Sequence, residues 1–162
     1  MSFNTSFYSY RDDITDEIIF QSLQKLQEYE TSFKLRIASK SPSKTDSEWI
    51  IFEESEEVPL WIDLRPFSAQ QHAWSFEEPT PRWVVNLNWS GSGVFHHWAA
   101  ALLPTLFFTD LKPGIFYDRQ QDRMYTVAAD YQDQLPKLIS SELYKQLKKM
   151  NLATEDNQLI FL

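Results

Sequence analysis

The chain has 162 residues, a formal net charge of −8 at pH 7 and no cysteine. This length suits one domain with a core large enough to fold without disulfides or metals, so we expect a single domain over residues 1–162. Without cysteine, disulfide bonds and thiol catalysis are excluded. Because phosphates repel an acidic surface, the charge argues against binding to nucleic acid or anionic membranes and favours a basic protein partner.

No targeting or membrane-spanning segment is apparent. The first 20 residues lack the basic region and continuous apolar run of a signal peptide. The longest apolar stretch, residues 98–108, contains Pro104 and Thr105 and is far shorter than the roughly 20 residues that span a bilayer. We therefore expect a cytoplasmic protein.

Local patterns predict alternating helices and strands in the first half of the chain. Residues 6–10 alternate as in a short strand, and residues 13–29 carry apolar side chains at helical spacings of three and four. Further strands are expected at residues 33–37, 49–52 and 60–64. Pro66 ends this antiparallel meander, because proline cannot donate to a strand ladder.

The second half begins with the clearest strand, residues 82–89, where Trp83, Val85, Leu87 and Trp89 share one face. The remaining expected elements are an aromatic loop at 67–81, a helix at 94–108 kinked or divided by Pro104, a hairpin of 115–118 with 124–127, a helix from 130 or 136 to 150, and an edge strand at 158–162. Together they predict an α+β fold, in which a mostly antiparallel sheet of about five to seven strands carries two or three packed helices.

The histidines do not form a metal-binding pattern. His96 and His97 are adjacent, so on a helix their rings point about 100° apart, whereas zinc-binding helices use positions i and i+4. His72 is the third histidine. We therefore expect no metal and no cofactor, and ordinary packing, capping or interface roles for the histidines.

The residues Ser90-Gly91-Ser92-Gly93 follow a predicted strand and precede a predicted helix. The segment lacks the lysine of a phosphate-binding loop and the third glycine of a dinucleotide fingerprint, so we interpret it as a turn in which Ser92 caps the helix. A catalytic triad of one of these serines, a histidine and a distant aspartate is possible on paper, but no spacing demands it. We expect no enzyme, with a small hydrolase or transferase using His96 or His97 as the alternative.

The charge distribution gives a more specific prediction. Residues 45–64 contain seven carboxylates and no lysine or arginine, with tryptophans in and near the segment. Carboxylates beside aromatic anchors can steer a basic protein and then hold it. The predicted partner-binding residues are Asp46, Glu48, Trp49, Glu53, Glu54, Glu56, Glu57, Trp61, Asp63, Trp74, Glu77 and Glu78. The alternative is a solvated acidic loop with tryptophans buried beneath it.

Three segments of the chain resemble the small cytoplasmic immunity proteins that neutralise bacterial polymorphic, contact-delivered or type VI secretion toxins. They are the tryptophan-rich strand 82–89, the helix with His97-Trp98 and Leu102-Leu103-Pro104, and the following residues 107–118. The resemblance implies a non-catalytic protein that binds a toxin domain tightly, often over its active site. The acidic surface then favours a basic nuclease as the toxin, and an acidic adaptor or nucleic-acid mimic remains an alternative.

Overall fold

The computed structural model describes residues 2–29, 34–40, 47–53, 59–68, 80–90 and 93–160. This part of the chain forms one seven-stranded antiparallel sheet and four α-helices, which confirms the predicted α+β class. The strands are β1 (Ser2–Ser9), β2 (Leu35–Lys40), β3 (Ser47–Glu53), β4 (Leu60–Pro66), β5 (Trp83–Ser90), β6 (Gly114–Asp118) and β7 (Arg123–Tyr125). The helices are α1 (Asp16–Tyr29), α2 (Val94–Asp110), α3 (Ala128–Leu138) and α4 (Ser141–Lys149).

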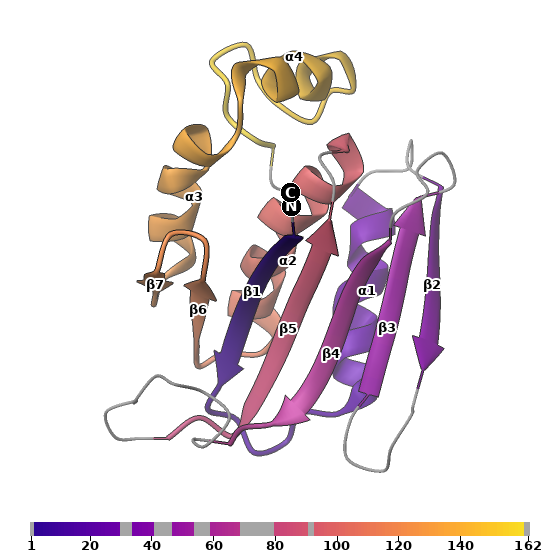
Figure 1. Cartoon of the computed structure of the whole chain (residues 1–162), viewed down its shortest axis with the longest axis vertical. Helices are drawn as coiled ribbons and strands as arrows, with labels where there is room; N and C mark the ends of the chain where they lie inside the picture. The colour runs from indigo at the N-terminus through magenta and orange to yellow at the C-terminus, as the bar shows by residue number, and fades with distance from the viewer. Residues whose placement is uncertain are drawn as a thin grey trace.

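The strands lie in the order β2-β3-β4-β5-β1-β6-β7, so the first strand of the chain sits inside the sheet, between β5 and β6. Helices α1 and α2 cover one face of the sheet, whereas α3 lies beside β6 and β7 and α4 lies beyond one end (Figure 1). We call the face opposite α1 and α2 the helix-free face. In the described ranges, no helix is both long and apolar enough to cross a membrane.

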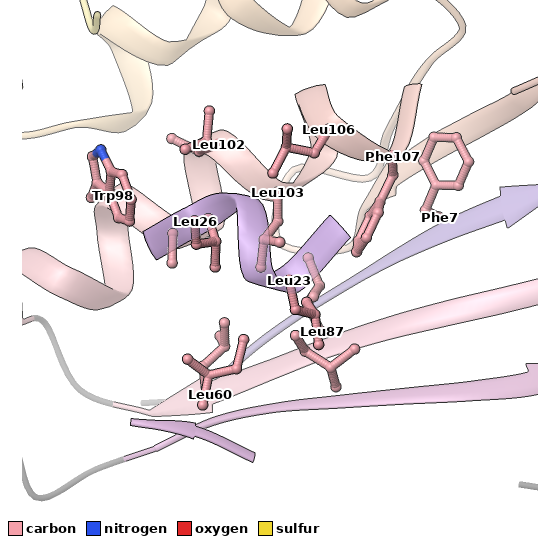
Figure 2. Close-up of a cluster of buried hydrophobic side chains, with 14 of the residues drawn as sticks. Phe7, Leu23, Leu26, Leu60, Leu87, Trp98, Leu102, Leu103, Leu106 and Phe107 are labelled. Atoms are coloured by element: carbon pink, nitrogen blue, oxygen red, sulfur yellow. The ribbon is translucent and has the colours of Figure 1, made fainter. Parts of the chain in front are cut away.

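The core lies between the sheet and helices α1 and α2. Leu23 and Leu26 of α1, Leu103 and Phe107 of α2 and Leu87 of β5 gather there and are fully buried (Figure 2). On β5 buried positions alternate as predicted from Val85 to Trp89, so that these side chains face the helices, whereas Trp83 is only half-buried and Val84 is buried on the other face. Removing this apolar surface from water is the main stabilising contribution to the fold.

Helix α2 runs unbroken from Val94 to Asp110 through Pro104, so of the two predicted outcomes a division at Pro104 is wrong, and a kink stays a prediction. Proline removes one helical hydrogen bond. However, most residues of α2 are buried, Pro104 among them, and packing on several sides of a helix outweighs such a local preference.

The predicted last helix is in fact two helices, which raises the number of helices to four. Ile139 has an extended backbone between α3 and α4, and the Ser140 hydroxyl accepts a hydrogen bond from the Leu143 N–H at 3.2 Å. Such a cap starts a new helix. Within residues 158–160 the predicted edge strand is reduced to one bridge between Leu159 and Ala153.

Asp110, at the end of α2, links α2 to α1 through side-chain hydrogen bonds. Its carboxylate accepts hydrogen bonds from Lys25 Nζ at 2.7 Å and from the Ser22 hydroxyl at 2.7 Å, both on α1. Its backbone carbonyl accepts a further bond from Arg11 at 2.6 Å. These contacts fix the position of α1 relative to α2 and therefore relative to the sheet.

Candidate functional site

The predicted partner-binding residues that the structure describes do not share one surface. Trp49 and Glu53 lie on the same face of β3 as Ile51 and point toward the helices, with exposed fractions of 3% and 6%. Glu53 also accepts a hydrogen bond from the Lys34 N–H at 3.4 Å. A role for Trp49 and Glu53 as exposed contacts is therefore wrong, because alternate side chains of a strand that carries helices on one face are buried.

Trp61 and Asp63 lie on the helix-free face. Trp61 is 42% exposed, far more than the buried Trp49, Trp89 and Trp98. Asp63 accepts a hydrogen bond from Asn86 at 2.8 Å and forms an ion pair with Arg65 at 3.2 Å. Since Arg65 compensates the Asp63 carboxylate, the acidic segment does not present an uncompensated negative charge at this position.

Of the eight remaining predicted residues, the structure describes only Glu48. Glu48 is half-buried near the start of β3. The seven that lie outside the described residues are Asp46, Glu54, Glu56, Glu57, Trp74, Glu77 and Glu78. A continuous acidic patch across residues 45–64 therefore stays a prediction, and the described site has to be built around Glu48.

Glu48 lines a groove of about 410 Å³ between the start of α1 and the edge of the sheet formed by β2 and β3. We call it the acidic groove. Asp16 and Glu17 contribute two further carboxylates from the first turn of α1. The other described lining residues are Phe20, Ile37, Ser39, Ser47 and Trp49. None of the described lining residues is basic, so Asp16 and Glu17 place two negative charges beside the apolar walls. Glu48 alternates with Trp49 along β3, so its side chain points toward the helix-free face, as does that of its register partner Asp63.

The carboxylates of the acidic groove differ from others nearby in having no ionic partner. Asp12 pairs with Arg82 at 3.1 Å and Asp13 with Arg11 at 2.8 Å. By contrast, in the described part of the chain Asp16, Glu17 and Glu48 form no ion pair. The negative charges of Asp16 and Glu17 are therefore available to a cationic group from another molecule, whereas Glu48 lies opposite Lys40 in the β2–β3 ladder.

Sequence reasoning missed Asp16 and Glu17 as site residues because their place in the first turn of α1 already explains them. Carboxylates at a helix start interact favourably with its free N–H groups, and Thr15 caps the same turn by accepting a hydrogen bond from the Ile18 N–H at 3.3 Å. Only the packing of α1 over β2 and β3 brings these two residues to the edge of the sheet where Glu48 lies. No local pattern encodes that approach.

A second pocket, of about 240 Å³, lies on the helix-covered side of the sheet between β1, β5, β6, α2 and α3. We call it the aromatic pocket. Phe3 stacks on Trp89 with ring centroids 5.1 Å apart, and the edge of His97 meets Phe3 at 6.1 Å. Thr5, Asp118 and Lys137 also line this pocket. It therefore offers aromatic surface and both signs of charge.

The adjacent histidines have separate environments. His96 is 2% exposed and its ring lies 5.5 Å from that of Phe95. His97 is half-buried in the wall of the aromatic pocket, and burial lowers its pKa, with a smaller effect from neighbouring His96. Among the residues that the structure describes, no group of three or more histidine, aspartate or glutamate side chains could hold a metal ion. Ser90 is exposed, and Ser92 and His72 lie outside the described residues.

Asp118 is the buried charge of the aromatic pocket, with an exposed fraction of 8%. Burial raises its pKa, while backbone N–H groups of Gln120, at 3.0 Å, and Gln121 partly oppose that rise. The nearest cation across the β6–β7 ladder is Arg123, but its guanidinium lies over the Tyr125 ring, 5.1 Å from the centroid. The Asp118 carboxylate has no cationic partner in the described part of the protein.

Replacing Asp118 with asparagine is expected to raise the free energy of unfolding at pH 7 by about 0.5–2 kcal/mol. A raised pKa means that the folded protein binds the proton more tightly than the unfolded chain, so the wild type loses stability as pH rises through the folded-state pKa. The advantage of Asp118→Asn should therefore shrink as pH falls toward about 4, because the carboxyl of the folded protein is protonated before that of the unfolded chain. Thermal unfolding between pH 4 and pH 8 measures it, with exposed Asp133→Asn as control. An equal gain at all pH values would contradict this prediction.

Comparison of the chain with protein-family models, with curated proteins and with solved structures gave no match in any of the three. The resemblance to immunity proteins therefore stays a prediction. The function has to be inferred from the chemistry of the acidic groove and of the helix-free face.

Proposed function

We propose that this protein is an immunity protein, which binds a basic toxin domain and occludes its active site. The observation that carries the proposal is the acidic groove, where Asp16 and Glu17, which form no ion pair in the described part of the chain, lie beside apolar walls, and where Glu48 lies near the start of the adjoining strand. Such a site suits the arginine and lysine side chains of a partner, because the carboxylates attract the charge and the walls pack against the aliphatic stems.

The charge of the whole chain supports the same class of partner. A net charge of −8 accelerates association with a basic protein and repels nucleic acid. A nuclease needs a basic cleft to hold its phosphate substrate. An acidic protein seated in that cleft excludes the substrate, so a nuclease domain is the toxin that this groove suits best.

Trp61 is the proposed hydrophobic anchor. It is a large exposed side chain on the helix-free face. Along β4 it lies two residues from Asp63, and Asp63 pairs with Glu48 of β3. Tryptophan is enriched among the residues that dominate binding energy at interfaces. A partner that reaches around the start of β3 can contact both the acidic groove and Trp61.

The test uses the chain as bait to isolate a basic toxin domain, starting with the proteins encoded beside its gene, and binding is measured at several salt concentrations. Neutralising Asp16→Asn, Glu17→Gln and Glu48→Gln together should weaken affinity at least about tenfold, mainly through slower association, and flatten the salt dependence. Trp61→Ala should instead accelerate dissociation, with a loss of about thirtyfold or more. Both variants should also protect cells poorly against the expressed toxin.

The matched control neutralises three exposed carboxylates elsewhere, Asp130→Asn, Asp133→Asn and Glu155→Gln, and should leave affinity within a few-fold of the wild type. Thermal unfolding of each variant checks the fold, since carboxylates in the first turn of α1 contribute up to about 1 kcal/mol to stability. Wild-type affinity and protection by the triple variant would overturn the acidic groove as the binding site. Equal binding to many unrelated basic proteins would favour a general adaptor instead.

A further inference from the structure

The aromatic pocket contains buried polar groups whose hydrogen-bonding capacity the described protein does not use. Thr5 and Trp89 line it with exposed fractions of 5% and 7%. In the described part of the chain, neither the Thr5 hydroxyl nor the Trp89 indole N–H has a hydrogen-bond partner. Leaving a buried donor or acceptor unpaired costs about 1–3 kcal/mol, and most such groups in folded proteins are satisfied. Two unsatisfied groups in one pocket point to a bound molecule.

Two opposite charges line the same pocket without neutralising each other. Asp118 is buried and lacks a cationic partner, and Lys137, on α3, forms no ion pair in the described part of the chain. A small molecule that pairs with both Asp118 and Lys137 needs one cationic and one anionic group. The buried carboxylate selects the cation more strongly, because charges attract more in a dry environment than in water.

The side chains that line the aromatic pocket also favour an apolar group on the bound molecule. The stacked rings of Phe3 and Trp89, the edge of His97, and Tyr131, Leu135 and Ile139 surround the space. Aromatic faces attract both cations and flat apolar groups. At about 240 Å³ the pocket is below the range of about 300–1,000 Å³ that holds drug-sized ligands, so it suits a molecule of roughly one ring.

We propose that the aromatic pocket binds a small zwitterion of the free amino acid class with an apolar or aromatic side chain. Its ammonium group pairs with Asp118, its carboxylate with Lys137, and its side chain packs against Phe3 and Trp89. The Trp89 indole N–H and the Thr5 hydroxyl supply the remaining hydrogen bonds. This site is separate from the acidic groove, so it does not depend on the proposed toxin-binding function.

The test follows the indole N–H resonance of Trp89 by nuclear magnetic resonance, assigned by its loss in Trp89→Phe. Free phenylalanine, tyrosine, leucine and methionine are titrated, together with their N-acetyl derivatives, which lack the ammonium group, and their methyl esters, which lack the carboxylate. At least one free amino acid should shift the resonance saturably. Its N-acetyl derivative and its ester should each bind at least about tenfold more weakly.

Variants assign each charge. Asp118→Asn should weaken binding of the free amino acid and the ester at least about tenfold but leave the N-acetyl derivative unchanged. Lys137→Gln should weaken the free amino acid and the N-acetyl derivative but not the ester. Independently of both charges, Ala100→Leu fills the pocket from α2 and should abolish all binding, whereas Asp133→Asn, outside the pocket, should change nothing. No saturable shift with any of these probes, or shifts that Ala100→Leu leaves intact, would overturn the proposal in favour of a water-filled pocket.

Discussion

Replacing Phe107 with alanine is expected to lower the free energy of unfolding by about 3–5 kcal/mol, the usual range for a fully buried phenylalanine. Phe107 of α2 lies in the core, is 0% exposed and packs against the ring of Phe7 with centroids 5.9 Å apart (Figure 2). Truncation removes its burial from water and leaves a cavity between α2 and the sheet, which the rigid strands can fill only partly. Urea unfolding followed by tryptophan fluorescence measures the loss.

The adjacent residue provides the control. Phe108 touches the same Phe7 ring at 5.2 Å but is only half-buried. Phe108→Ala should therefore cost less than half as much, with an unchanged dependence of unfolding on urea concentration. Equal losses for both variants would mean that the core is not centred on Phe107. The loss of about 3–5 kcal/mol expected for Phe107→Ala is a substantial part of the total stability of about 5–15 kcal/mol that is typical of a domain.

The sequence predicted those elements whose pattern is both long and strongly periodic. On β5 strict alternation identified the strand and its buried face, and on α1 the spacing of Ile19, Leu23 and Leu26 identified the helix and its core side. Predictions failed where tertiary contacts override a local preference. Pro104 is accommodated inside α2 because the helix is buried on several sides, and the last helix is interrupted at Ile139, whose side chain is itself buried.

The candidate sites were harder to predict because each is assembled from distant segments. The run of carboxylates drew attention to Glu48, but burial of Trp49 and Glu53 depends on which face of β3 the helices cover. The aromatic pocket depends on register: Thr5 of β1 lies opposite Asp118 of β6 because β1 inserts between β5 and β6. Pairings between strands so far apart in the chain follow from the whole fold and not from any local pattern.

Substitution of Gly114 tests how tightly β1 and β6 pack against each other. Gly114 opens β6 and pairs with Ser9 of β1, and a methyl group at this position would meet the ring of Phe7 and the Tyr8 carbonyl oxygen, the latter at 2.6 Å. Gly114→Ala should therefore destabilise the protein by about 1–3 kcal/mol through overpacking. Thermal unfolding measures this, and ordinary far-ultraviolet circular dichroism would show that the variant still folds.

The sign of the Gly114→Ala effect separates two physical causes. Where the added methyl group fits, glycine to alanine stabilises a protein by about 0.4–1 kcal/mol, because the unfolded chain loses conformational freedom. A destabilised variant therefore reports a steric clash in the folded state. Phe7→Leu replaces the clashing ring with a smaller side chain. It should therefore lower the free energy of unfolding less in the Gly114→Ala background than in the wild type, because the effects of residues in contact are not additive. A neutral or stabilising Gly114→Ala would instead mean that β6 can shift away from β1, and with it Asp118 at the far end of the strand.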